Sequence, residues 1–212
     1  MRYTYNGLEL STLPPLVQPT ALFCEDNQLV TVPLYPELET LACRRNMLVA
    51  LPPYPELVSL SCDCNNLTRL PVCPKLAHLS CEDNQLASLP EASELLDLVC
   101  ALNELTRLPL YLKLTDLWCQ GNQLTELPRF PNLESLYCDD NQMTWLPAYP
   151  ALRELSIRGN QIIEMPYYPL LEVVDLGENP VGVRMTDPTD IDEYHRLYRC
   201  RQETSFEGER TR

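Results

Sequence analysis

Cysteine and histidine are the residues whose spacing first suggests chemistry. Cys62, Cys64, Cys73, His78 and Cys81 lie close together in the chain, and zinc prefers thiolate and imidazole ligands. Side chains alternate between the two faces of a strand, however. We therefore expect Cys62 and Cys81 to point inward, His78 to point outward and Cys73 to lie on a return segment. Because ligands on different faces cannot converge on one ion, the sequence predicts no metal site and no cofactor.

Nucleophilic catalysis has few candidates, since the chain contains only two histidines, His78 and His195. Ser59, Ser61 and Ser80 are neighbours of His78 on the expected strand surface. Serines on a flat sheet lack the oxyanion donors and the enclosed pocket that acyl transfer needs. His195 is expected to be solvated on a terminal helix. The sequence therefore predicts a protein that is not an enzyme.

A period of nineteen residues governs nearly the whole chain. Nine asparagines keep this spacing without a slip: Asn27, Asn46, Asn65, Asn84, Asn103, Asn122, Asn141, Asn160 and Asn179. Seven cysteines form a second ladder, each three residues before an asparagine: Cys24, Cys43, Cys62, Cys81, Cys100, Cys119 and Cys138. Because this ladder continues as Ile157 and Leu176, its position is apolar, and we expect reduced thiols in a core. A fixed short period is typical of stacked repeats.

Aligned on the asparagine, one unit reads L-x-x-L-x-C-x-x-N-x-L-x-x-L-P-x-Y-P-x, as in the residues from Leu38 to Pro55. Apolar residues alternate with variable ones around Leu41 and Cys43, which predicts a short strand. The Leu-Pro-x-Tyr-Pro segment predicts an extended or polyproline return, because proline cannot donate to a β-ladder. We expect the recurring tyrosines of this segment to cover the convex edge of the core.

This unit resembles the leucine-rich repeat, L-x-x-L-x-L-x-x-N-x-L. More narrowly it resembles the short bacterial repeats ending in Leu-Pro of YopM-like and IpaH-like effectors, over residues 13 to 181. The resemblance implies a fold of the α/β repeat class, made mostly of short parallel β-strands in a solenoid. IpaH-like proteins add a ubiquitin-ligase domain with a Cys-x-Asp motif. The same motif occurs here, as in Cys81-Glu82-Asp83, but its cysteine occupies a core position of the repeat, so we do not expect ligase activity.

The ends of the array predict the remaining organisation. We expect a degenerate N-terminal capping repeat at 1–18, leucine-rich repeats at 19–182, a C-terminal capping helix at 183–200 and a disordered tail at 201–212. Asp187 or Thr189 would cap the helix. Its apolar face would comprise Ile191, Tyr194, Leu197 and Tyr198.

Composition narrows the class of partner. The formal net charge of −14 argues against binding a nucleic-acid phosphate backbone and favours a basic protein surface. No apolar run is long enough to span a membrane. Reduced core thiols predict a reducing, cytoplasmic location, and the resemblance adds secretion by a dedicated system into a host cell.

Alternation leaves the residues six, four, two and one before each asparagine on an outward, concave face. These positions hold twelve acidic residues and three arginines. Val99, Trp118 and Tyr137 would stack on successive strands, beside Leu102. Acidic residues surround them, namely Glu82, Asp97, Asp116, Asp139 and Asp140. An aromatic centre ringed by charge is typical of a protein-binding hot spot.

Two readings of this face stay open. One is an acidic, solvated surface whose aromatics merely pack as cross-strand pairs, and the other is a surface that binds a partner. We favour non-catalytic binding of a protein with a basic or amphipathic surface through the residues just named. This includes the possibility of a secreted effector acting on a host protein. The alternative is a self-associating intracellular adaptor or scaffold.

Overall fold

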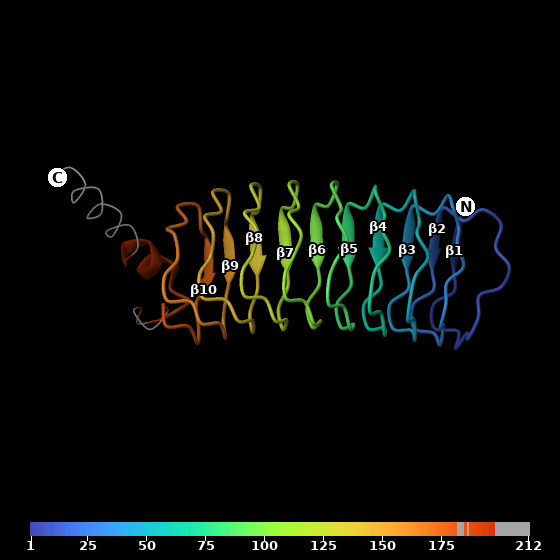
Figure 1. Ribbon diagram of the computed structural model, residues 1–212, viewed down its shortest axis with the longest axis horizontal. Coiled ribbons are helices and arrows are strands. Elements are labelled where there is room, and N and C mark those ends of the chain that lie inside the picture. The colour runs from blue at the N-terminus through green and yellow to red at the C-terminus, as the bar shows by residue number, and fades with distance from the viewer. Residues whose placement is uncertain (182–184, 186, 198–212) are drawn as a thin grey trace.

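The structure is a computed structural model that describes residues 1–181, 185 and 187–197. Ten strands of three residues lie side by side in one parallel sheet, in the order of the sequence. They are β1 (Arg2–Thr4), β2 (Ala21–Phe23), β3 (Thr40–Ala42), β4 (Ser59–Ser61), β5 (His78–Ser80), β6 (Asp97–Val99), β7 (Asp116–Trp118), β8 (Ser135–Tyr137), β9 (Glu154–Ser156) and β10 (Val173–Asp175). Figure 1 shows a nearly straight rod of stacked turns, as predicted. At about 4.8 Å per strand the sheet spans roughly 40 Å.

Residues that pair in adjacent strands are nineteen apart in the sequence. Every repeat position therefore forms a column along the rod. Leu22 lies opposite Leu41, and Leu41 lies opposite Leu60. These central leucines are buried, and so are the seven cysteines that follow them by two residues. The residues on either side of the central leucine face away from the core. Turns of identical length therefore turn a sequence period into continuous buried ladders.

The asparagine of each turn ties that turn to the preceding one. Asn103 donates from Nδ2 to the carbonyl oxygens of Cys81 (2.9 Å), Cys100 (3.2 Å) and Ala101 (3.0 Å), and its Oδ1 accepts the Leu86 N–H at 3.0 Å. The same pattern recurs along the column, in which every asparagine is at most 9% exposed. Two of the four partners, Cys81 and Leu86, belong to the previous turn. The invariant amide thus satisfies backbone groups that stacking has removed from water.

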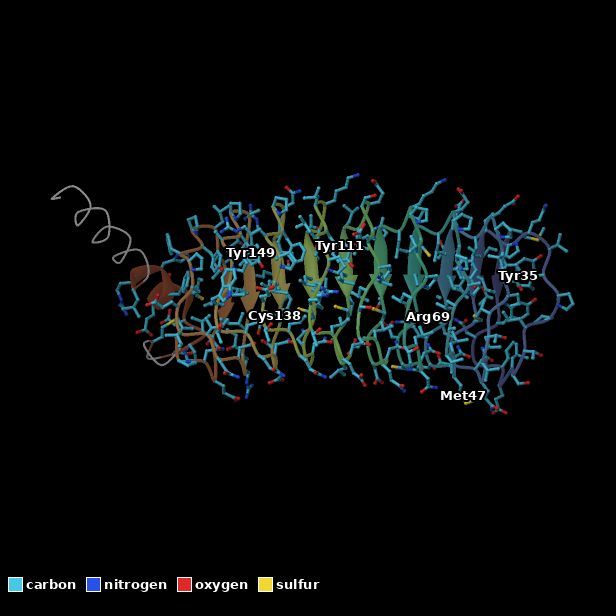
Figure 2. All side chains as sticks on the ribbon, viewed as in Figure 1. Tyr35, Met47, Arg69, Tyr111, Cys138 and Tyr149 are labelled. Carbon is cyan, nitrogen blue, oxygen red and sulfur yellow. The ribbon has the colours of Figure 1, made fainter. Side chains whose placement is uncertain are left out.

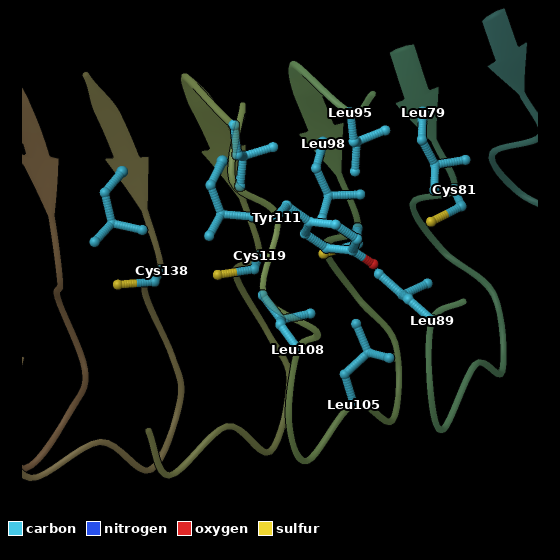
Figure 3. Packing of buried hydrophobic residues seen from close by; sticks show 14 of the residues in the cluster. Leu79, Cys81, Leu89, Leu95, Leu98, Leu105, Leu108, Tyr111, Cys119 and Cys138 are labelled. Atoms are coloured by element: carbon cyan, nitrogen blue, oxygen red, sulfur yellow. The ribbon is translucent and has the colours of Figure 1, made fainter. Parts of the chain in front are cut away.

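The return segments carry an aromatic ladder inside the core. Tyr111, Phe130, Tyr149 and Tyr168 are buried, and successive rings stack at 6.3 to 6.5 Å between centroids. The Tyr111 hydroxyl donates to the Pro90 carbonyl of the preceding turn at 2.9 Å. In Figure 3 the Tyr111 ring lies among leucines of the core. The prediction that this column covers the convex edge is therefore wrong for these rings, which fill the interior.

The thiol ladder lies beside these rings. The nine cysteines of the described chain are all free, and in Figure 3 the side chains of Cys119 and Cys138 point the same way. That direction is poor geometry for a disulfide between neighbours. Burial raises the pKa of the Cys100 thiol well above its ordinary value, so it stays neutral. Outside the core, side chains project from the edge of the rod into solvent, as that of the exposed Met47 does in Figure 2.

A short helix at residues 191–197 packs on the last turn, again as predicted. Its cap differs from the prediction: the Asp190 side chain, not that of Asp187 or Thr189, accepts the Glu193 N–H at 2.9 Å. His195 is not simply solvated, because its Nε2 lies 2.8 Å from the Leu171 carbonyl oxygen. The predicted contribution of Tyr198 and the predicted tail at 201–212 lie outside the described residues. The division at 18, 182 and 200 stays a prediction.

We predict that Asn103→Ala lowers the free energy of unfolding by about 3 kcal/mol, because it removes four hydrogen bonds and leaves buried backbone groups unpaired. Urea denaturation followed by circular dichroism measures the change. Asn132→Ala is the matched control, since that exposed asparagine makes a single bond, to the Leu112 carbonyl at 2.9 Å. An equal loss in both variants would contradict the role assigned to the asparagine column.

Candidate functional site

The outward strand face that alternation predicts is present, and we keep for it the name concave face. In β6, β7 and β8 the central leucine is buried, and the residues on either side of it are partly exposed. Val99 lies opposite Trp118, and Trp118 lies opposite Tyr137. The three side chains therefore form one row across adjacent strands. The structure thus brings Val99, Trp118 and Tyr137 together, as the sequence predicts.

The row is rigid because its rings stack. The Trp118 and Tyr137 centroids are 5.7 Å apart and their planes differ by 3°. The Tyr137 hydroxyl donates to the Glu154 carboxylate on the next strand. This hydrogen bond, with partial burial and the charge of Glu154, raises the pKa of Tyr137 to about 12, so the phenol remains a donor at neutral pH. Contacts within the protein therefore hold both rings in place.

The acidic residues around the row divide into engaged and available groups. Asp97 pairs with His78 on the neighbouring strand. Asp116, directly opposite Asp97, accepts from the Thr115 hydroxyl at 2.7 Å. Glu82 is half-buried at the wall of a hollow, and Asp140 is exposed. The available carboxylates therefore face solvent beside the aromatic row.

Asp139 has a structural contact that sequence patterning did not reveal. Its Oδ1 accepts the Ser156 hydroxyl at 2.6 Å and the Arg158 N–H at 2.8 Å. Burial is the main cause that raises the pKa of this carboxyl, and the two hydrogen bonds oppose it. Asp63 is held in the same way by Ser80 and the Glu82 N–H. Both carboxylates join adjacent turns, so only part of the acidic face is free for a partner.

Leu102 and Gln120 complete the centre of the face. Leu102 is 54% exposed, and one of its methyl carbons lies 2.8 Å from where a Cβ on Gly121 would stand. The lack of a side chain at Gly121 therefore lets Leu102 lie over the next turn. Gln120, which the sequence analysis missed, has a buried Oε1 without a hydrogen-bond partner in this fully described part of the chain. Only its repeat position, two before Asn122, could have signalled it.

Positive charge sits at the two ends of the face. Near the N-terminus Arg44 pairs with Glu25 at 2.6 Å and Arg45 with Asp26 at 3.4 Å, around a hollow of about 330 Å³. Near the C-terminus Arg158 pairs with Glu178 at 2.6 Å. Between them, from β5 to β8, the outward positions carry carboxylates and no arginine or lysine. Arginine–carboxylate pairs therefore neutralise acidic residues at the two ends of the face, whereas the net charge of its central turns stays negative.

The residues first considered for catalysis and metal binding are dispersed. Cys62, Cys73 and Cys81 are buried in the core, while His78 is exposed on the sheet face. Within the described ranges, no three or more histidine, cysteine, aspartate or glutamate side chains gather in a group that could hold a metal ion. Burial raises the pKa of the Cys62 and Cys81 thiols well above the ordinary value, which disfavours the thiolate form.

Solved structures of bacterial proteins share this fold. YopM from Yersinia enterocolitica WA-314 superimposes with a TM-score of 0.74 at 35% identity, covering 79% of this chain and 39% of that one. YopM from Yersinia pestis, a leucine-rich effector protein, gives 0.74 at 29% identity, with coverages of 84% and 60%. The functional domain of InlJ from Listeria monocytogenes, which includes a cysteine ladder, gives 0.75 at 32% identity, with coverages of 84% and 42%. No family model and no curated protein sequence matches the chain.

The chain is a leucine-rich-repeat protein. Its repeats are similar to those of YopM and InlJ, and it spans between 39% and 60% of the lengths of these three chains. Leucine-rich repeats of this kind are protein-interaction modules, so the fold supports binding of a protein. None of the helices described here is long and apolar enough to cross a membrane.

We predict that Asp139→Asn changes how stability depends on pH. The pKa of Asp139 is raised in the folded state, so the folded protein binds a proton more readily than the unfolded chain does. Its contribution to the free energy of unfolding therefore falls as the pH rises from below 3.8 through the raised pKa. The asparagine keeps an acceptor oxygen for Ser156 and Arg158 without this loss.

Thermal unfolding of both proteins between pH 3 and pH 7 tests this expectation. Relative to wild type, the variant should gain stability as the pH rises. Glu126→Gln is the control, because it removes the same charge from an exposed position and Glu126 is not among the groups that raise the pKa of Asp139. This control should lack the trend. A variant that loses stability relative to wild type at neutral pH would show that the carboxylate charge stabilises the fold.

Proposed function

We propose that the protein binds another protein, without catalysis, through the acidic concave face centred on Trp118 and Tyr137. The observation that carries the proposal is the stacked, half-exposed ring pair in the middle of the sheet. Tryptophan and tyrosine bury a large area for little loss of side-chain entropy, and here stacking has already removed much of that freedom. Val99 and Leu102 extend the apolar centre.

The charges around the rings favour a basic partner surface. Asp97, Asp116 and Asp140 face solvent near the row, and Glu82 lies one turn before Val99. Complementary charge speeds encounter and suppresses wrong partners more than it adds affinity. Asp139 supports the site by holding Ser156 and Arg158, and would contribute charge without direct contact.

The likeness to YopM supports a biological setting for this binding. YopM is a leucine-rich effector protein of Yersinia pestis, and the repeats align over 84% of the present chain. We therefore extend the proposal to an effector that acts on a host protein after secretion by a dedicated system. Growth of the source cells with host cells, followed by fractionation, tests this part separately from the binding site.

We predict that Trp118→Ala weakens partner binding by at least about 2 kcal/mol, roughly thirtyfold, because the indole is the largest contact at the centre. Far-UV circular dichroism should not change, since Trp118 lies outside the core. Capture of partners from a cell lysate with wild type and with the Trp118→Ala, Tyr137→Ala double variant identifies the ligand, and calorimetry then measures its affinity.

Trp145→Ala is the matched control, because that tryptophan is 44% exposed at a position away from the strands. Full affinity in Trp118→Ala, or equal losses in both tryptophan variants, would remove Trp118 from the binding site. Light scattering of the purified protein tests the self-associating alternative, which requires an oligomer that dissociates when Trp118 and Tyr137 are replaced.

A further inference from the structure

We propose that the partner occupies the concave face as an amphipathic α-helix lying along the solenoid axis, with a narrow apolar seam and basic residues on both sides of it. The inference rests on the proposed function and specifies the form of its ligand. It follows from two spacings on the face, one along the axis and one across it. It also follows from the positions of the carboxylates that, on the described strand face, have no arginine or lysine partner.

The axial spacing fits a helix better than an extended chain. Val99, Trp118 and Tyr137 lie on successive strands, so the row repeats about every 4.8 Å. Side chains on one face of a helix recur about every 5.4 Å, whereas those on one face of a strand recur about every 6.6 Å. Over two steps the mismatch is about 1 Å for the helix and nearly 4 Å for the strand. A segment running across the axis would meet only one turn of the row.

The transverse spacing also fits. Asp97, Asp116 and Glu154 lie on one side of the aromatic row, six residues before their asparagines. Glu82 and Asp140 lie on the other side, two and one residues before theirs. Four residues of extended chain, from the sixth to the second position before an asparagine, would span about 13 Å, close to the 10 to 12 Å diameter of a helix with its side chains. Basic residues on both flanks of one helix can therefore reach both acidic rows.

On the described strand face, the carboxylates without an arginine or lysine partner define the length of the occupant. Arg44, Arg45 and Arg158 already neutralise Glu25, Asp26 and Glu178 at the two ends. The acidic centre runs from the turn of Glu82 to that of Glu154, four strand spacings or about 19 Å. A helix covers that distance with about 13 residues. Charge complementarity thus selects a basic helix of about three to four turns.

The test uses a synthetic 14-residue peptide with leucines at i, i+3, i+7 and i+10, arginines on both flanks of that seam and alanine elsewhere. One control has the same composition in scrambled order, and the other carries proline in place of a central alanine, which breaks the helix. Anisotropy of a fluorescein label measures affinity, and circular dichroism measures the helicity of the bound peptide. We expect the patterned peptide to bind at least about tenfold more tightly than either control and to gain helicity on binding.

Paired charge variants test the flanks. Asp97→Asn with Asp116→Asn should weaken binding of the patterned peptide about tenfold, and Trp118→Ala at least as much. Glu104→Gln with Glu126→Gln removes the same net charge from exposed positions off the strands, and should weaken it less than about twofold. Similar losses of peptide affinity in both double variants would mean that net charge alone attracts the peptide, and would overturn the proposal of a helical ligand.

Equal affinity for the patterned and proline peptides, or no binding of the patterned peptide, also overturns the inference. The proposed function is judged separately by lysate capture. If capture still depends on Trp118 and Tyr137, the concave site stands and only the helical ligand is wrong. If the double variant captures the same partners as wild type, both the proposed function and the helical ligand are wrong.

Discussion

Hydrogen bonding of the asparagine amide between turns is the constraint on which the structure depends. A turn of nineteen residues has neither the length for a helix nor a partner strand of its own, so its backbone is satisfied only by neighbouring turns. Asn103 bonds three carbonyls and one N–H, and these belong to two turns. A residue inserted into any turn would move one amide out of line with the backbone groups it serves. The period is therefore constant along the chain for a local reason, and the regular strand face is a consequence of it.

The same stacking imposes strain just before each asparagine. All nine preceding residues have positive φ, and only Gly121 and Gly159 are glycines. Leu102, at φ 54°, pays a cost of about 1 kcal/mol for this conformation. It is tolerated because the Leu102 N–H then donates to the Gln120 carbonyl at 2.8 Å. That conformation also places an exposed leucine beside the aromatic row. Backbone strain thus contributes directly to the shape of the candidate site.

The parts of the molecule that repeat could be predicted from sequence, and the parts that depend on one contact could not. Nine aligned asparagines and alternation around Leu41 were sufficient for the sheet, its order and the outward row of Trp118. Tyr111 was misplaced because a periodic tyrosine looks the same whether its ring fills or covers a core. The hydroxyl bond to Pro90 decides the matter. Asp139 and Asp140 looked equivalent as neighbouring acids, yet only the former reaches Ser156. The predicted caps, Asp187 and Thr189, were likewise wrong because it is the Asp190 side chain that reaches the Glu193 N–H.

The electrostatic pattern of the concave face is the feature that favours the proposed binding over the alternative of a merely solvated acidic surface. In-register stacking places Asp97 directly opposite Asp116, and like charges at such positions destabilise a sheet. At the ends of the face arginines relieve comparable repulsion, since Arg44 bridges Glu25 and approaches Asp63 at 4.0 Å. At the centre, among the described outward positions from β5 to β8, His78 takes the place of an arginine, and it pairs with Asp97. Solubility would be served equally by charges spread over any exposed edge. Carboxylates concentrated around the stacked, half-exposed rings of Trp118 and Tyr137 are instead an arrangement that a basic ligand would stabilise, and a sheet held by its asparagines keeps them in place.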